Sequence, residues 1–173
     1  MIGAIKKLFE RSKAHKYLLD HTAEAEAMYR RIASDLGLEL VKEPDAPVEL
    51  SMIFPKQEKL RSEVWVCLQN LDELWFVVDG YTCSMFPYED VKDEFESYLR
   101  KALTGEFRIR KFVRRRDGKV FKSLLQQNMG DHWRTVTRYG NVLGLMPTLF
   151  YDVKDEFLAA GTRDPLISSK SDQ

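Results

Sequence analysis

The sequence predicts an α+β protein built on antiparallel sheet, with two successive strand-rich modules, each closed by a helix, and two helices at the N-terminus. Several short runs alternate apolar and polar residues and are separated by turn residues, a pattern that is typical of antiparallel strands. Other segments repeat apolar residues at helical spacing. The 173 residues, 44% of them hydrophobic, are enough for one buried core. We therefore expect one domain over residues 1–167 and a disordered polar tail over 168–173.

The N-terminus predicts a short amphipathic helix. Its apolar residues recur at helical spacing: Ile2, Ile5, Leu8 and Phe9. Lysines interrupt this apolar run, so we expect neither a secretory signal nor a membrane span, and a cytoplasmic location is the default. We expect the helix to dock on the core or on a second copy of the chain, while a membrane-surface anchor is the alternative.

A second helix is predicted over Thr22–Leu36. Thr22 is suited to cap its start, and Gly37 is suited to the left-handed conformation that ends many helices. Its buried stripe is expected to consist of Ala25, Met28, Ile32 and Leu36. Pro44 and Pro47 then place a connector before the first strand.

The first module is expected to contain a strand over residues 48–54, a hairpin of residues 63–69 and 73–79, and a strand over 81–86. The helix that closes it has an apolar stripe and ends at Gly105. The stripe consists of Val91, Phe95, Leu99 and Ala102.

The second module begins with a hairpin of residues 107–116 and 119–127. Asp117 and Gly118 are the dipeptide that favours a two-residue hairpin loop. A strand over 132–139 and a final helix over 148–160 are predicted to follow.

The hexapeptide DVKDEF occurs twice, at residues 90–95 and 152–157. Acidic residues in a first helical turn oppose the helix dipole, and its Val and Phe lie on one helical face, so each copy predicts the start of a helix. We interpret the two copies as traces of a pseudo-repeat, with modules at 48–104 and 106–160. Independent convergence on a helix-start pattern is the alternative.

Charge is unevenly distributed along the chain, although Lys plus Arg equals Asp plus Glu at 27 each. Residues 106–139 contain ten Lys and Arg and three Asp and Glu, whereas residues 70–105 contain three and eight. The second module therefore offers a positive surface and the first a negative one.

Strand alternation predicts where the positive charge is displayed. A two-residue loop would place Arg116 opposite Lys119, Arg114 opposite Phe121 and Phe112 opposite Ser123. One face would then be basic and aromatic, and we predict it as the binding surface: Arg108, Arg110, Phe112, Arg114, Arg116, Lys119 and Phe121, with Gln127 beside them. The other face would join the core through Phe107, Ile109, Val113, Val120 and Leu124.

Several functions fit such a face. It could dock an acidic protein partner, or it could bind single-stranded nucleic acid or a phosphate ligand through its cations and rings. It could also be a solvated edge, or be neutralised by the acidic helix over residues 89–96. No nucleic-acid-binding sequence signature accompanies it.

Signals for catalysis are few. We find no phosphate-binding glycine loop, no nucleophile motif and no metal-ligand spacing, and we expect no cofactor and no metal. Cys67 and Cys83 lie in apolar runs and are expected to be free thiols. A cleft near Asp79, Tyr81 or His132 is the one enzymatic alternative.

Two tryptophans mark a second surface. Trp65 is predicted on the sheet face opposite Val64 and Val66, and Trp75 opposite Leu74 and Phe76. A sheet that is apolar on both sides needs helices on one side and another subunit or helix on the other. We therefore expect a non-enzymatic, homodimeric protein-binding module of the adaptor, small-chaperone or inhibitor type, with nucleic-acid binding and catalysis as the alternatives.

Overall fold

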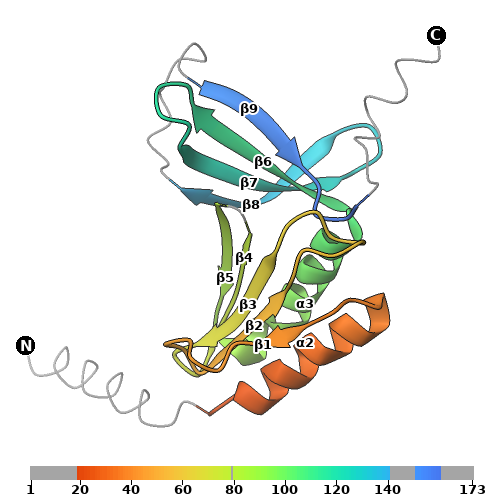
Figure 1. Ribbon diagram of the computed structural model, residues 1–173, viewed down its shortest axis with the longest axis vertical. Helices are drawn as coiled ribbons and strands as arrows, with labels where there is room; N and C mark the ends of the chain where they lie inside the picture. The colour runs from red at the N-terminus through yellow and green to blue at the C-terminus, as the bar shows by residue number, and fades with distance from the viewer. Residues whose placement is uncertain (1–18, 79, 141–150, 161–173) are drawn as a thin grey trace, which may run out of the picture.

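The computed structural model describes residues 19–78, 80–140 and 151–160, and within them the chain is an α+β protein with two antiparallel sheets (Figure 1). The elements are α2 (Thr22–Leu36), β1 (Val41–Lys42), β2 (Leu50–Phe54), β3 (Val64–Gln69), β4 (Glu73–Val78), β5 (Tyr81–Met85), α3 (Tyr88–Thr104), β6 (Phe107–Arg114), β7 (Val120–Asn128), β8 (Trp133–Gly140) and β9 (Tyr151–Glu156). The predicted opening helix and polar tail lie outside the described residues. Neither described helix combines the length and apolar character needed to cross a membrane.

Helix α2 has the predicted bounds, Thr22–Leu36. Three residues of its predicted stripe are buried, namely Ala25, Met28 and Ile32, while Leu36 is half-buried. Gly37 ends the helix with a φ of +59°. The predicted cap was wrong by one residue, because His21 occupies the N-cap position and makes no capping hydrogen bond through its side chain. The backbone N–H of Thr22 instead donates to Asp20 Oδ1 at 2.9 Å.

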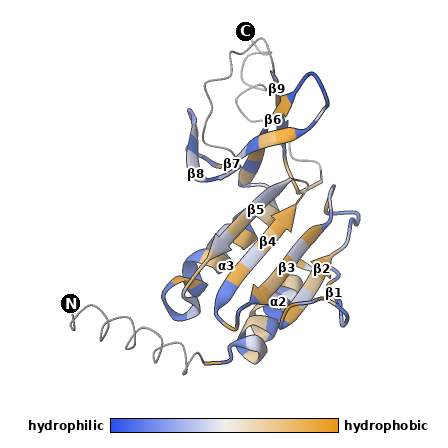
Figure 2. Ribbon diagram, turned by 90° about the vertical axis from the view of Figure 1, so that its left-hand side faces the viewer, coloured by the Kyte–Doolittle hydropathy of each residue, from blue (hydrophilic) through white to orange (hydrophobic). Residues whose placement is uncertain are grey.

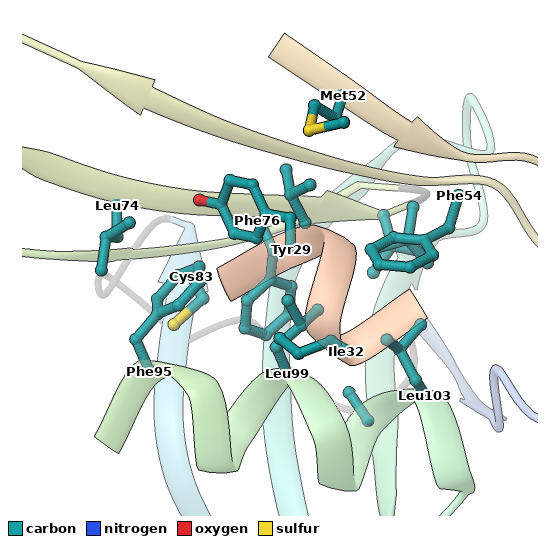
Figure 3. Close-up of a cluster of buried hydrophobic side chains, with 14 of the residues drawn as sticks. Tyr29, Ile32, Met52, Phe54, Leu74, Phe76, Cys83, Phe95, Leu99 and Leu103 are labelled. Atoms are coloured by element: carbon teal, nitrogen blue, oxygen red, sulfur yellow. The ribbon is translucent and has the colours of Figure 1, made fainter. Parts of the chain in front are cut away.

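The first sheet is a five-stranded meander in the order β1-β2-β3-β4-β5, with α2 and α3 on one of its faces (Figure 1). Alternate residues of β2 to β5 point toward the helices and form the core. At the centre of this core, Phe95 of α3 packs against Tyr29 of α2 and Phe76 of β4, and all three rings are fully buried (Figure 3). The predicted hairpin of residues 63–69 and 73–79 is confirmed, with β3 paired to β4. Strand β1 was missed, because two residues carry no alternation to detect.

The second sheet has the order β8-β7-β6-β9. The two-residue loop predicted at its hairpin was wrong. Arg114 N–H donates to Lys119 O and Gly118 N–H donates to Arg114 O, both at 2.9 Å, so residues 115–118 form a four-residue loop. Gly118, at a φ of +68°, supplies the left-handed residue that this longer loop needs.

The four-residue loop pairs Arg114 with Lys119, two residues from its predicted partner Phe121. A bulge between Phe112 and Val113 takes back one of these residues, so the net shift of the register is one residue. Phe112 lies opposite Lys122, and a bulge follows it. Leu124 therefore pairs with Arg110 and lies on the basic face, not on the predicted core face with Ile109, because a one-residue slip exchanges the two faces of a strand.

The second copy of DVKDEF is a strand, which contradicts the predicted helix over residues 148–160. The first copy lies inside α3, whereas Asp152 to Glu156 of the second belong to β9, paired antiparallel with β6 from Ile109↔Glu156 to Arg114↔Tyr151. Helix-forming residues continue the first copy, and Asp72 Oδ1 accepts a hydrogen bond at 2.8 Å from the N–H of Tyr88, the first residue of α3. Around the second copy, pairing with β6 overrides the local preference. Residues 151–156 therefore form a strand where a closing helix was predicted, and the described elements of the second module do not repeat the order of the first.

The two sheets share one hydrophobic core. Phe107, Ile109 and Leu125 from the second sheet belong to the same buried cluster as the first. Tyr98 of α3 packs edge-on against Phe107, and the hydroxyls of Tyr81 and Thr137 share a hydrogen bond.

A short segment after β9 returns to the first unit, which consists of the five-stranded sheet with α2 and α3. Arg61 N–H donates to Leu158 O and Ala160 N–H donates to Lys59 O, both at 2.8 Å. This pairing joins residues 158–160 to the loop between β2 and β3. The stretch of chain that forms the second sheet is therefore tied to the first unit through α3 at its start and through residues 158–160 at its end.

Ser123 offers a test of the junction between the sheets. It is fully buried, and its hydroxyl donates to Gly80 O at 2.7 Å. Ser123→Ala is expected to lower the free energy of unfolding by about 1–2 kcal/mol, because a carbonyl loses its partner. Urea denaturation measures the change, with Ser84→Ala at an exposed position of β5 as the control. Equal stability of the two variants would contradict the role given to Ser123.

Candidate functional site

The face of the second sheet that points away from the first unit carries cations and aromatic rings. Alternation along β6 and the pairing with β9 bring its members together, since Phe112 lies opposite Val153 and Arg114 opposite Tyr151. We call this surface the basic aromatic face: Arg108, Arg110, Phe112, Arg114, Phe121, Lys122, Tyr151 and Val153.

Three rings form the centre of the basic aromatic face. The centroids of Phe112, Phe121 and Tyr151 lie 5.5–6.3 Å apart, and each pair meets edge to face. Lys122 Nζ lies 4.9 Å from the centroid of Phe112. The rings are half-buried, and Val153 beside them is 48% exposed. The centre is therefore a small, partly exposed apolar patch with a cation directly above it.

Two of the predicted contact arginines are held by the protein's own carboxylate. Both oxygens of Asp155 accept hydrogen bonds from Arg110 at 2.7 Å. Arg108 lies 3.0 Å from the same carboxylate, donates to Gln126 Oε1 at 3.0 Å and stacks over Trp133 at 4.2 Å. Because Arg108 is only 4% exposed, it belongs to the scaffold of the face and is not accessible to a partner.

The carboxylate that pairs with Arg108 and Arg110 of the basic aromatic face comes from β9. The acidic helix α3, which was the expected source, forms its ion pairs elsewhere. Glu89 pairs with Lys92, and Glu96 with Arg31 and Arg100, all within or between the helices. The helix predicted over residues 148–160 gave no reason to expect these ion pairs, because it did not place Asp155 beside β6.

The positive charge of the second sheet and its loops is only partly neutralised by the protein's own carboxylates. Residues 106–140 and 151–160 together contain eleven Lys and Arg against six Asp and Glu. Arg114 pairs with Asp117 at 2.8 Å, while Arg116, Lys119 and Arg138 are exposed. Figure 2 shows the hydrophilic end of the β6–β7 hairpin, where two of these three cations lie. Arg116 and Lys119 therefore flank the basic aromatic face from the loop, not from the strand positions predicted for them.

The sheet face of the first unit that the helices leave uncovered is a second surface. Trp65, 40% exposed, and Val77 line a shallow depression of about 470 Å³ together with Cys67. Glu63 accepts a hydrogen bond from the Trp65 indole, and Glu49 and Glu73 lie near Cys67. We call this surface the open face. It is apolar at its centre and acidic at its rim.

Both cysteines are free thiols, which confirms the prediction. Burial raises the pKa of Cys67 to about 11, and Glu73 adds to the shift. Burial also raises the pKa of Cys83 to about 11. Thiols of this kind are protonated at neutral pH and are poor nucleophiles.

Of the three residues of the enzymatic alternative, the structure describes Tyr81, which lies in the core, and His132, which is exposed. Tyr81 is fully buried, its hydroxyl is bonded to Thr137, and burial holds its pKa far above the ordinary value. His132 is exposed in the β7–β8 turn, where its hydrogen bond at 2.6 Å lowers the pKa of Asp131. Asp79 lies outside the described residues.

One polar cluster escaped sequence reasoning. His21, Glu24 and Glu89 bring an imidazole nitrogen and two carboxylate oxygens within 4.8 Å of one another. The spacing of three residues between His21 and Glu24 is a visible signal of ligands on one helical turn, but Glu89 is distant in sequence and only the fold places it there.

Scans against models of known protein families, against curated proteins and against solved structures found no match. The surfaces and the polar cluster are therefore interpreted from their own chemistry.

Asp155 is expected to stabilise the basic aromatic face. Asp155→Asn removes the charge that compensates Arg108 and Arg110, and we expect the free energy of unfolding to fall by about 1–3 kcal/mol, less than for a fully buried pair because Asp155 is partly exposed. Asp152→Asn is a matched control on the same strand, since Asp152 and its partner Arg115 are both more than half exposed. It is expected to cost less than about 0.5 kcal/mol in the same urea titration. A larger loss for Asp152→Asn would contradict this assignment.

Proposed function

We propose that the protein is a protein-binding module, of the adaptor, small-chaperone or inhibitor type, that contacts an acidic partner through the basic aromatic face. The observation that carries the proposal is the position of the apolar patch. Phe112, Phe121, Tyr151 and Val153 lie at the same end of the sheet as the exposed cations Arg116 and Lys119.

This arrangement suits the burial of a small apolar group surrounded by carboxylates. Rings and Val153 supply contact area that loses water on binding, while the cations of the loop steer an acidic surface into place. Arg110 and Arg114 contribute less than expected from the sequence, because Asp155 and Asp117 already pair with them.

The packing of the rings favours a protein partner over single-stranded nucleic acid. Base stacking needs an open ring face, but each ring of the trio packs against the other two, and Lys122 covers Phe112. Nucleic-acid or phosphate binding through the same cations is the alternative.

Charge reversal in the loop tests this proposal. We expect the double variant Arg116→Glu/Lys119→Glu to lose about tenfold or more in affinity for any partner identified by copurification from the native cell, because rim charges steer association. Calorimetric titration of that purified partner measures the change, with Lys56→Glu, an exposed lysine of the first unit, as the control. Equal binding by the double variant and the wild type would reject the loop cations as contact residues.

The alternative has its own readout in the same preparation. A fluorescent single-stranded oligonucleotide is expected to show no anisotropy change at physiological salt. Binding that weakens steeply with added salt, and that is lost in the double variant, would favour the nucleic-acid function instead.

Self-association is the second part of the proposal, and the two surfaces support it. The open face is apolar with an acidic rim, and the basic aromatic face is apolar with a basic rim, so they are complementary in charge. If each copy offers both, a reciprocal contact gives a closed two-fold dimer in which the basic aromatic faces are covered, so an acidic partner would bind the monomer. We propose a second copy of the chain as the occupant of the open face.

Trp65 tests this dimer. We expect wild-type protein to sediment as a dimer that dissociates at high salt, and Trp65→Lys to sediment as a monomer, because a lysine would face the cations of the basic aromatic face. Met129→Lys, at an exposed position in the β7–β8 turn, is expected to remain dimeric. A monomeric wild type at all concentrations, or the same behaviour in both variants, would reject the dimer.

A further inference from the structure

The N-termini of α2 and α3 meet at a cluster of three potential ligands. His21 is the N-cap residue of α2 and Glu24 lies in its first turn, while Glu89 is the second residue of α3. His21 Nδ1 lies 3.6 Å from Glu24 Oε2 and 3.7 Å from Glu89 Oε1. One nitrogen and two oxygens from two helices therefore face a common point.

The imidazole nitrogen has no hydrogen-bond partner. His21 is only 4% exposed, and its Nδ1 is buried and unpaired. Separations of 3.6 and 3.7 Å are too long for a hydrogen bond to either carboxylate. Burial of a polar atom without a hydrogen-bond partner costs free energy. Because Nδ1 lies between two anionic oxygens, a bound cation would satisfy all three atoms.

The ring of His21 is fixed in this direction by its surroundings. Tyr88 stacks on it with ring centroids 4.3 Å apart and an interplanar angle of 11°. The β3–β4 loop holds both helix starts, because Leu71 O accepts a hydrogen bond from His21 N–H at 3.4 Å and Asp72 accepts one from Tyr88 N–H. The direction of the His21 ring and the positions of the two helix starts are therefore set by contacts outside the three ligands.

We propose that His21, Glu24 and Glu89 form a binding site for a divalent transition-metal cation such as Zn²⁺. Imidazole with carboxylate ligands suits Zn²⁺ rather than Mg²⁺ or Ca²⁺, which prefer oxygen alone. Tetrahedral zinc with bonds of about 2.0 Å places its ligands about 3.3 Å apart, a few tenths of an ångström closer than the two separations from His21. Both glutamates are more than half exposed, so their side chains are able to close this difference.

The local charge balance is compatible with a dication. Two carboxylates at helix N-termini are stabilised as anions by the helix dipoles, and a divalent cation neutralises both. Lys92 competes for Glu89, but it bonds Oε2 at 2.9 Å and leaves Oε1 facing His21. Bound metal would link the two helices directly, so it would stabilise the folded state in proportion to its occupancy.

Zinc titration of chelator-treated full-length protein tests the site. We expect one saturable site in calorimetry and a rise in Tm on adding ZnCl₂. Glu24→Gln and Glu89→Gln keep the side-chain shape at exposed positions, so folding is retained. Each is expected to weaken Zn²⁺ binding by about tenfold or more, since even residues that only support metal ligands change affinity by that factor. Visible absorption of bound Co²⁺ reports whether nitrogen and oxygen ligands surround the metal.

Two controls separate this site from other zinc-binding groups. Asp90→Asn makes the same charge change one residue from Glu89 and is expected to leave the affinity unchanged. His132→Ala removes the exposed His132–Asp131 pair and is also expected to bind as the wild type does. Absence of saturable binding by the wild type would overturn the proposal, as would equal zinc affinity of Glu24→Gln, Glu89→Gln and the wild type.

Discussion

The second half of the fold depends on the pairing of β9 with β6. Asp155 compensates Arg108 and Arg110, and Glu156 compensates Lys111, which is 3% exposed. Without β9, strand β6 would be a sheet edge, and its two buried cations, Arg108 and Lys111, would lose the carboxylates of Asp155 and Glu156. Such charges are tolerated inside a protein only when they are paired. The ion pairs thus explain both why β9 is a strand and why the basic aromatic face is less positive than its sequence indicates.

Local patterns predicted the first unit well. The apolar stripe and Gly37 gave α2 its bounds, and strand alternation gave the β3–β4 hairpin and the opposite orientation of Trp65. These features depend on neighbours within a few residues, so the sequence contains the information directly. The β3–β4 loop shows what local patterns do not predict. Leu71 and Asp72 accept hydrogen bonds from the N–H groups of His21 and Tyr88, and residue periodicity does not connect these distant positions.

The second unit was predicted less well because its elements depend on distant partners. The same six residues, DVKDEF, lie within α3 in one place and form most of β9 in the other, where pairing with β6 replaces the helical state. The hairpin register differs from the prediction by one residue, because a four-residue loop replaces the expected Asp-Gly reversal and a bulge follows Phe112. Of the predicted contact residues, Phe112 and Phe121 do lie together in the aromatic trio. Tyr151 was missed, because it was placed within the predicted helix over residues 148–160, not in a strand beside β6.

The return of residues 158–160 to the β2–β3 loop has a consequence for how the chain reaches its final form. The bridge between Leu60 and Ala159 closes a loop of about 100 residues. Closure entropy rises with loop length, and contacts this remote in sequence are slow to form. A growing polypeptide therefore completes its first sheet early, but it gains this last bridge only after almost the whole of its described sequence has been synthesised.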